Sequence, residues 1–568
     1  MYMKCGGWFM FKPNKNHDEQ SMFPVRYEMD YDLREELNAG WAGLFYRKVF
    51  SNINELQFAS LYHPFKGRSN FPVNILVGME ILKEMFSLTD EQLLARYRFD
   101  LAFRYSLGLE DINSKQMAVR TLYYFRASIA ELEEQGNDLI KPVFDRFRDI
   151  LIEELGIKTG LQRSDSVMIG ANAKRLNRVM LFHKVLSNLA DNVKESGYAL
   201  SPKCEELLKK DEDGFCYRLT KENYEAKTVE IGEEIYRLLT ENVSHIRVRK
   251  QKSFRQGLRL LKEQCQIYKS SGITLKPSVE IKASSMQTPV DDEATYREKN
   301  GKKNVGYKVN AVETCDPENL MQVITSIVTA PNNTDDAELF RGQLKELKEI
   351  TDIDTAICDG AYSSKALREE CGEDVQLILS AVRGVDLEVI KEKASLAEYI
   401  IVKTGEFGTC PGSQAPKSIQ NKEDGTVVLR FDHKICNTCN KKGYCLACVS
   451  KTQSRLVIDA KRRWMDEFLK VIGTDDGQFL MNLRSAVEGL MGLMKPKYLC
   501  GRILFRGLKK INIRMLFRGI GVNFKRYQGY VEGDMRKAGV LSLANQFFTL
   551  FRQKFLSLSL NFDNCFFQ

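Results

Sequence analysis

The order of apolar segments between residues 161 and 380 limits the folds open to this chain more than any other feature. Five short runs, bounded by turn residues and rich in apolar and β-branched side chains, predict strands at 161–169, 305–312, 320–328, 355–358 and 375–380. A long, charged, helical stretch follows the first strand, and a helix over 335–349 separates the third from the fourth. This alternation predicts an α/β fold, with a mixed sheet flanked by helices.

Two of the predicted strands carry an aspartate. Asp165 lies within the first run, and Asp359 directly follows the fourth. Ligands of α/β sheets gather at strand ends, so both residues are candidates for a site. Each also has an ordinary explanation: Asp359 precedes a glycine, as turn-forming residues do, and Asp165 is flanked by serines at what could be an exposed strand edge.

A third acidic residue lies in segment 478–497. Its apolar residues recur at three- and four-residue steps, which predicts one amphipathic helix closing at Pro496. Arg484, Glu488 and Lys495 would project from one face of that helix, within roughly 40° of one another at about 100° per residue. A carboxylate flanked by two cations suits a phosphate-handling site that holds a divalent ion. A solvated, salt-bridged helix face is the alternative.

The acidic residues and the Arg–x3–Glu–x6–Lys spacing resemble DDE-type insertion-sequence transposases, in the branch with a Tyr–Arg–Glu–Lys signature. The likeness continues through the basic segment 502–526, through residues 290–313 and into the N-terminal third, so it covers most of the chain. The signature Tyr, three residues before the Arg, is Met481 here. In the resembling family that Tyr supports DNA contacts near the cut, so the replacement affects this accessory role. It does not affect the expected carboxylates.

The resemblance implies an RNase H-like catalytic core in which Asp165, Asp359 and Glu488 hold Mg²⁺ or Mn²⁺. Asp165 would bridge two ions, Asp359 would complete one site, and Glu488 would complete the other. The same resemblance implies a transposase that binds the terminal inverted repeats of its own insertion sequence and catalyses cleavage and strand transfer. The residues expected to contact DNA phosphates are Arg484, Lys495, Arg506, Lys509 and Lys510.

The expected partners are double-stranded DNA, as repeat ends and as target, and a second copy of the chain in a paired-end complex. No uninterrupted apolar run reaches the roughly 20 residues of a membrane span. No signal peptide is recognisable, which favours a prokaryotic cytoplasmic, nucleoid-associated protein. Two alternatives stay open: a non-catalytic DNA-binding protein derived from a transposase, and a metal-dependent nuclease that does not join strands. Without a Walker-type glycine-rich loop, ATP use is not expected.

Positive charge is concentrated in two segments, although the net charge is only +9. Residues 245–262 and 502–526 contain many Lys and Arg and no acidic residue. Such runs are typical of phosphate-binding surfaces, although each could be a solvated helix face. A further candidate DNA-contacting loop, or alternatively a solvated turn, comprises Asp291, Asp292, Thr295, Arg297 and Lys299.

Five of the fourteen cysteines are close in sequence and have metal-ligand spacing. They form two C-x2-C pairs preceded by one further thiol: Cys410, Cys436, Cys439, Cys445 and Cys448. Such pairs are typical of Zn²⁺ sites, but their separation is shorter than in a standard zinc ribbon. Zinc, iron–sulfur ligation and free thiols are the alternatives. A cysteine-containing insert recurs in the resembling family.

These patterns predict five regions. A helical domain that binds DNA ends, with a helix-turn-helix-like unit as the resembling family has, would occupy 1–155, with a plain helical packing domain as the alternative. The catalytic core would comprise 156–174, 290–400 and 453–530. A helical insertion over 175–289, a Cys-rich insertion over 401–452 and a tail over 531–568 complete the chain.

Overall fold

The computed structural model describes residues 11–15, 28–66, 69–109, 111, 116–217, 219–220, 222–268, 272–299, 301–382, 392–399, 407–496 and 503–533. Contacts divide the chain into two units. The first comprises Met1–Lys158, Pro317–Ile324 and Lys509–Gln568, and the second comprises Thr159–Asp316 and Thr325–Leu508. The expected core range 453–530 and these contact units differ at their C-terminal boundary, because the contacts group the chain from Lys509 onward with the first unit.

Within its described residues, the first unit is helical, as the sequence predicts. Its elements are α1 (Tyr31–Ala39), α2 (Trp41–Lys48), η2 (Phe50–Asn52), η3 (Glu55–Leu61), α3 (Val73–Phe86), α4 (Asp90–Phe99), α5 (Leu101–Ser106), α6 (Val119–Glu134), α7 (Lys141–Leu155) and a helix over 508–533. The Thr89 side chain caps α4 by accepting a hydrogen bond from the Gln92 N–H. In turn, the Gln92 side-chain oxygen accepts a hydrogen bond from the Thr89 N–H.

Helix α3 forms the centre of this unit and is buried from Val73 to Met85. The helix over 508–533 approaches it closely, because a Cβ added at Gly521 would lie 3.0 Å from the Met85 Cβ. Only a residue without a side chain permits that spacing. The N-terminal helices therefore share one core with a helix from the far end of the sequence.

Buried ion pairs join these two helices. Arg514 pairs with Glu80, and Arg518 lies 3.7 Å from Glu84, with all four side chains at most 5 % exposed. A charge buried this deeply requires a partner of opposite sign. Two cations of the basic segment 502–526, Arg514 and Arg518, are thus neutralised inside the protein and do not contribute to a phosphate-binding surface.

The second unit contains the predicted mixed sheet. Its strands are β1 (Leu161–Gly170), β4 (Thr295–Lys299), β5 (Lys302–Thr314), β6 (Ile324–Pro331), β7 (Thr355–Cys358) and β8 (Gln376–Leu379). The order is β4-β5-β1-β7-β8, with β6 also paired to β5. Strand β1 runs antiparallel to β5 and parallel to β7, which in turn runs parallel to β8. The sheet is consistent with the expected RNase H-like core; only β4 was not predicted.

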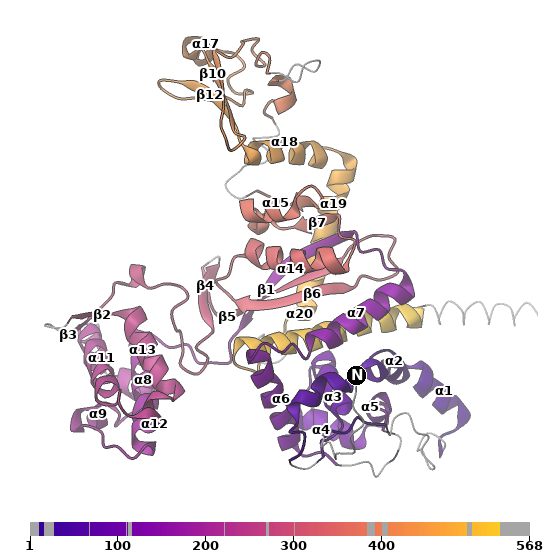
Figure 1. Ribbon diagram of the computed structural model, residues 1–568, viewed down its shortest axis with the longest axis vertical. Coiled ribbons are helices and arrows are strands. Elements are labelled where there is room, and N and C mark those ends of the chain that lie inside the picture. Colours follow the sequence, from indigo (N-terminus) through magenta and orange to yellow (C-terminus); the bar gives the residue numbers. More distant parts are fainter. Residues whose placement is uncertain are drawn as a thin grey trace, which may run out of the picture. The chain divides into compact units, whose positions relative to one another are not determined.

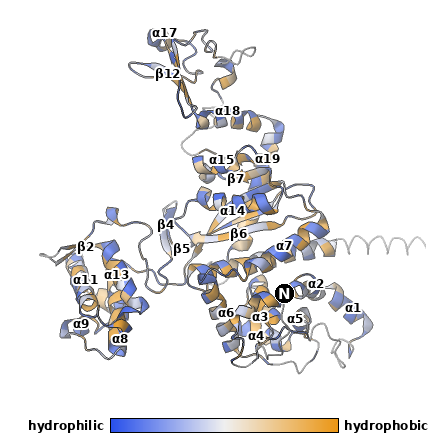
Figure 2. Ribbon diagram, viewed as in Figure 1, coloured by the Kyte–Doolittle hydropathy of each residue, from blue (hydrophilic) through white to orange (hydrophobic). Residues whose placement is uncertain are grey.

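Helices cover the sheet and are amphipathic, with polar and apolar sides (Figure 2). They are α14 (Asp336–Ile350), α15 (Lys365–Cys371), α18 (Ala460–Ile472), α19 (Asp475–Ser485) and α20 (Val487–Met494), with the short turn η5 (Gly360–Tyr362) after β7. Apolar residues of α14, α15 and α18 form one cluster with β7 and β8. A smaller cluster joins Ile357 and Ile378 to α19. Figure 1 shows α14 in front of the sheet.

Two insertions interrupt this core, as predicted, and each has its own apolar cluster. The first contains α8 (Arg178–Glu195), α9 (Pro202–Leu207), α10 (Glu212–Cys216), α11 (Tyr224–Glu241), α12 (Ile246–Arg249), α13 (Lys252–Gln264), β2 (Cys265–Tyr268), β3 (Gly272–Leu275) and η4 (Ser278–Glu280). The second contains η6 (Leu396–Tyr399), β9 (Ser418–Asn421), β10 (Val427–Phe431), α17 (His433–Asn437), β11 (Cys448–Val449) and β12 (Ser454–Ile458).

Of the predicted tail over 531–568, all but the first three residues lie outside the described residues. Among the helices that are described, none combines the length and the apolar character needed to cross a bilayer.

Candidate active site

Asp165 and Asp359 lie at the same level on neighbouring strands. The parallel register of β1 and β7 pairs Ser164 with Cys358, and each aspartate is the next residue along its strand. Side chains alternate between the faces of a sheet, so Asp165 shares a face with Arg163, and Asp359 shares a face with Ile357. Both neighbours contact α19, which shows that the two carboxylates lie on the face that this helix covers.

Arg484, near the end of α19, lies beside this acidic pair. Its guanidinium is 3.6 Å from Asp359 Oδ1, which also accepts hydrogen bonds from the Gly360 N–H at 2.6 Å and the Ser380 hydroxyl at 3.0 Å. Burial raises the pKa of the Asp165 carboxyl, and the charge of Asp359 adds to that increase. The Ser166 N–H and the charge of Arg484 act in the opposite direction. The pair is thus a strongly negative site with one cation beside it.

The single helix predicted over 478–497 is two helices, α19 and α20, separated at Ala486. Two side chains donate hydrogen bonds to backbone carbonyl groups that would accept from backbone N–H groups in a continuous helix. The Ser485 hydroxyl donates to the Asn482 carbonyl, and the Arg163 guanidinium donates to the Leu483 carbonyl. A side chain inserted into the helical hydrogen-bond ladder is a recognised cause of such breaks. The angular argument that placed Arg484 and Glu488 on one helix face is therefore wrong.

Glu488 and Lys495 lie on or directly after a helix that packs against the strand of Asp165. Helix α20 packs against β1, Glu488 is an exposed residue in its first turn, and the exposed Lys495 ends it. Among the described residues, no group of three or more His, Cys, Asp or Glu side chains is arranged to hold a metal ion. The structure thus brings Asp165 and Asp359 together but does not assemble Glu488 with them.

A buried polar network lies behind the acidic pair, and the sequence analysis missed it. The Tyr362 hydroxyl donates to Asn310 Oδ1 at 2.6 Å, and the Asn310 amide donates to Gln343 at 2.6 Å and to Ser164 at 3.1 Å. Asn310 is fully buried on β5. The network connects the residue before Asp165 to the turn after Asp359. An amide between apolar neighbours in a buried strand was the available signal.

The segment around Asp291, expected as a DNA-contacting loop or a solvated turn, makes several contacts within the protein. Asp291 accepts hydrogen bonds from the Tyr307 hydroxyl and the Gly507 N–H, and Asp292 pairs with Lys252 at 2.8 Å. Thr295 and Lys299 are the end residues of β4. Within that strand, Arg297 lies 3.5 Å from Asp336, which also pairs with the buried Lys308 at 3.0 Å. Of these ion pairs, only Lys308 with Asp336 is buried, whereas Arg297 is partly exposed and Lys299 is exposed.

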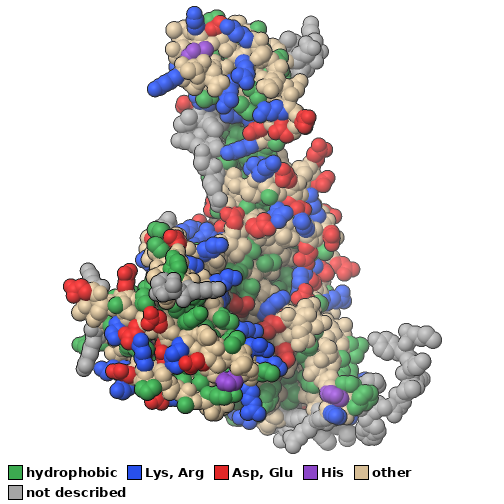
Figure 3. Space-filling model, turned by 60° about the vertical axis from the view of Figure 1, so that its left-hand side comes forward, with side chains coloured by type: hydrophobic (Ala, Val, Ile, Leu, Met, Phe, Trp, Pro, Cys, Tyr) green, Lys and Arg blue, Asp and Glu red, His purple; other side chains and the backbone are tan. Residues whose placement is uncertain are grey.

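The remaining predicted DNA contacts lie at the surface. Arg506 is exposed in the second unit, and Lys509 and Lys510 are exposed in the first. On the face displayed in Figure 3, Lys and Arg are interspersed with Asp and Glu. Met481, which replaces the signature Tyr, packs against the apolar clusters beneath α19, so its side chain contributes to the core.

Four of the five clustered cysteines lie near one another, two of them beside Gly412. A Cβ at that glycine would lie 3.1 Å from the Cys439 sulfur and 3.7 Å from the Cys410 sulfur. Burial raises the pKa of the Cys436 thiol, and the charges of Cys410, Cys445 and Cys439 raise it further. Cys448 is exposed on β11. The donor types suit zinc, although the sulfurs are not arranged as a coordination shell.

Two family models match separate parts of the chain. Residues 409–528 match a transposase DDE domain, and residues 34–128 match a transposase domain (DUF772). The first match includes Glu488 and all five clustered cysteines, and it begins after Asp165 and Asp359. No curated protein matches the chain, and no solved structure matches it either.

The mixed sheet is consistent with the RNase H-like core of a DDE transposase. The two matches, which cover less than half of the chain, support the resemblance to DDE-type insertion-sequence transposases noted in the sequence. Such enzymes cut and join DNA and generally use a divalent metal.

Proposed function

We propose that this protein binds the terminal inverted repeats of its own insertion sequence and catalyses DNA cleavage and strand transfer, with Asp165, Asp359 and Glu488 as its catalytic carboxylates. The observation that carries the proposal is the adjacency of Asp165 and Asp359 on parallel strands, with α20 packed against the strand of Asp165. Two buried or half-buried carboxylates side by side repel each other, and a divalent cation relieves that repulsion.

The three carboxylates would hold Mg²⁺ or Mn²⁺, because these hard cations prefer oxygen ligands. Bound there, the metal would activate the attacking oxygen and stabilise the leaving oxygen of the phosphodiester. Arg484 balances the charge of Asp359 and can donate to a phosphate once metal neutralises that carboxylate. A shift of α20 relative to α19 at Ala486 would bring Glu488 to the pair when metal binds.

The test is cleavage of a DNA fragment carrying the repeats that flank the gene, with wild type, Glu488→Gln and the control Glu467→Gln. Glu467 is exposed on α18 and serves as a charge-matched control. We expect cleavage at the repeat boundary with Mg²⁺ or Mn²⁺ for wild type and control, and a loss of at least about 100-fold for Glu488→Gln, since removing a metal-binding or transition-state contact commonly has effects of this size.

The other outcomes decide between the alternatives. Cleavage retained by Glu488→Gln would overturn the assignment of that residue. Specific binding of repeats without cleavage in either metal would favour a non-catalytic DNA-binding protein. Cleavage without any joined product, on fragments with and without the repeats alike, would favour a nuclease.

We further propose that Cys410, Cys436, Cys439 and Cys445 bind zinc, while Cys448 does not. The mutual proximity of the first four thiols supports this set, as does the exposure of Cys448 on β11. Four thiolates around one Zn²⁺ are the usual structural site, and the bound ion would stabilise the small cluster of the Cys-rich insertion.

Elemental analysis of protein produced with added zinc should therefore give one zinc per chain for wild type and Cys448→Ser. Cys436→Ser should lose the metal and make the insertion more sensitive to proteolysis. Equal zinc loss in Cys448→Ser would disprove the choice of ligands, and metal-free wild type would disprove the site.

A further inference from the structure

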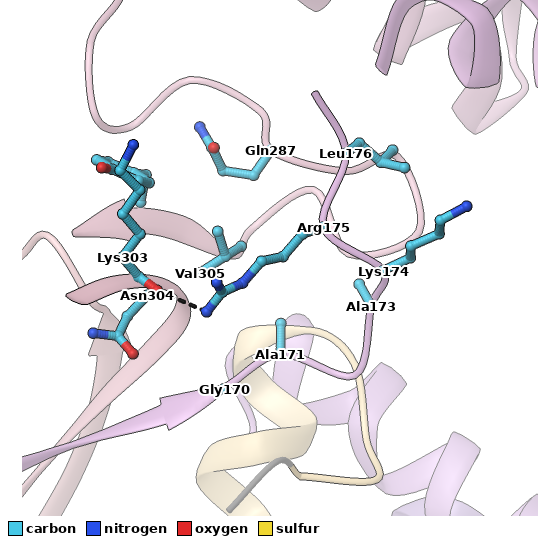
Figure 4. Close-up of a pocket in the computed structure, with 11 residues that line it drawn as sticks. Gly170, Ala171, Ala173, Lys174, Arg175, Leu176, Gln287, Lys303, Asn304 and Val305 are labelled. Atoms are coloured by element: carbon cyan, nitrogen blue, oxygen red, sulfur yellow. Dashed lines mark hydrogen bonds between the residues drawn. The ribbon is translucent and has the colours of Figure 1, made fainter. Parts of the chain in front are cut away.

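A basic pocket lies at the end of β1, away from the acidic pair (Figure 4). It has a volume of about 220 Å³ and forms where the chain leaves the sheet for the helical insertion. Its walls come from three places: the residues after β1, the loop around Gln287 and the β4–β5 hairpin. All of them belong to the second unit.

The chemistry of the pocket favours an anion. Its lining includes Lys174, Arg175 and Lys303, and none of its eleven described lining residues is acidic. The amides of Gln287 and Asn304 add neutral hydrogen-bonding groups. A guanidinium among amide groups is a common way to bind a phosphate group.

Arg175 is held in place across the pocket. Its guanidinium donates to the Lys303 carbonyl at 2.7 Å, which uses one of its five N–H groups and fixes the orientation of the others (Figure 4). Lys174 is paired at the surface with Asp213 of the insertion. An exposed pair of this kind is weak and can exchange for a phosphate.

A further cation extends the basic surface beyond the pocket. Arg506 donates to the Asn172 carbonyl at 2.9 Å, two residues before Lys174. The Ile503 N–H donates to the Gly170 carbonyl, so the segment that carries Arg506 runs beside the end of β1. The pocket and Arg506 are thus two neighbouring cationic positions on a rigid strand end.

The same strand fixes the spacing between the pocket and the acidic pair. Gly170 is five residues after Asp165, a distance of roughly 16 Å along a strand. Roughly five nucleotides of B-DNA cover that length. A duplex that has one phosphodiester at Asp165 can therefore place a second backbone phosphate, about five nucleotides away, in the pocket.

We propose that this pocket binds a single backbone phosphate of the DNA substrate, about five nucleotides from the phosphodiester that is cut, with Arg175 and Lys303 as its main contacts. This inference rests on the proposed function, because it requires a DNA strand bound across the acidic pair. It adds an anchoring point that sets the position of the strand along β1.

The test measures binding of full-length protein to repeat-end duplexes without Mg²⁺, using wild type, Arg175→Ala, Lys303→Ala and the control Arg341→Ala. Arg341 is paired at the surface with Glu338, so its replacement removes the same charge elsewhere. We expect roughly 3- to 10-fold weaker binding for the two pocket variants and a salt-dependence slope lower by about one phosphate contact. Unchanged melting temperatures would show that the variants fold.

Duplexes with one neutral methylphosphonate locate the contact. A methylphosphonate about five nucleotides from the cut should weaken DNA binding by wild type and by Arg341→Ala. It should not weaken binding by Arg175→Ala any further. If both pocket variants have the DNA affinity and salt-dependence slope of wild type, this inference alone is overturned. If wild type itself binds no repeat DNA, the proposed function is overturned as well. A third outcome would assign the pocket to a free phosphate and overturn the DNA assignment. In that case inorganic phosphate raises the melting temperature of wild type but not of Arg175→Ala, and no methylphosphonate position changes the difference in DNA affinity between the two proteins.

Discussion

Replacing Asp165 by Asn should lower the rate of DNA cleavage by at least about 1,000-fold while leaving repeat binding nearly unchanged. The substitution keeps the size of the side chain and removes the negative charge that the proposed metal site needs. DNA affinity comes mainly from cations on phosphates, and Asp165 supplies none. Single-turnover cleavage and gel-shift binding, measured on the same DNA, separate the two effects.

Asp354→Asn provides the matched control. Asp354 and Asp359 flank opposite ends of β7. Asp354 is exposed and lies at the end away from the acidic pair. Its cleavage rate should stay within about twofold of wild type, as expected for a surface substitution away from the chemistry. An Asp165→Asn enzyme that cleaves at the control rate would exclude Asp165 from catalysis.

Glu80→Ala should cause the largest loss of stability in the first unit, about 3–5 kcal/mol. Glu80 is fully buried and pairs with Arg126 at 2.8 Å and with Arg514. Its removal leaves buried arginine charge without compensation, which is among the costliest changes a protein can undergo. Arg126 keeps its contact with Asp90, so most of the effect should come from Arg514.

Urea unfolding in a Trp464→Phe background measures this change, because the remaining tryptophans, Trp8 and Trp41, belong to the first unit. Glu318→Ala, which breaks an exposed pair with Lys158, should change the free energy of unfolding by less than about 1 kcal/mol. Adding Arg514→Met to Glu80→Ala should recover part of the loss, because both partners are then absent. A double variant as unstable as the sum of its parts would argue against the buried pair.

The strands and the aspartates at their ends could be predicted from sequence because the signals are local. A short apolar run followed by a turn residue defines a buried strand, and β7 ends at Cys358, directly before Asp359, as predicted. The strand order then implied which strands are neighbours, and the register that pairs Ser164 with Cys358 brings the two aspartates together.

The helix break and the buried pairs could not be predicted in this way, because each depends on a partner far along the chain. Arg163 separates α19 from α20 through the Leu483 carbonyl, and nothing within segment 478–497 reports that contact. Likewise, Arg514 resembles a DNA-binding cation until Glu80 is placed beside it. Composition distinguishes charged from apolar segments, but it does not distinguish a charge facing water from one facing a buried partner.

The position of the helix over 508–533 has a consequence for how the protein is made. This helix covers α3 and supplies Arg514 to Glu80, yet more than 400 residues separate the two along the chain. During synthesis, α3 leaves the ribosome long before its partner exists, so the apolar surface of the N-terminal helices stays uncovered and Glu80 has Arg126 but not Arg514 beside it. That region can close only when translation has passed the helix over 508–533. A chain cut short before residue 508 therefore loses the core of its N-terminal unit as well as its end.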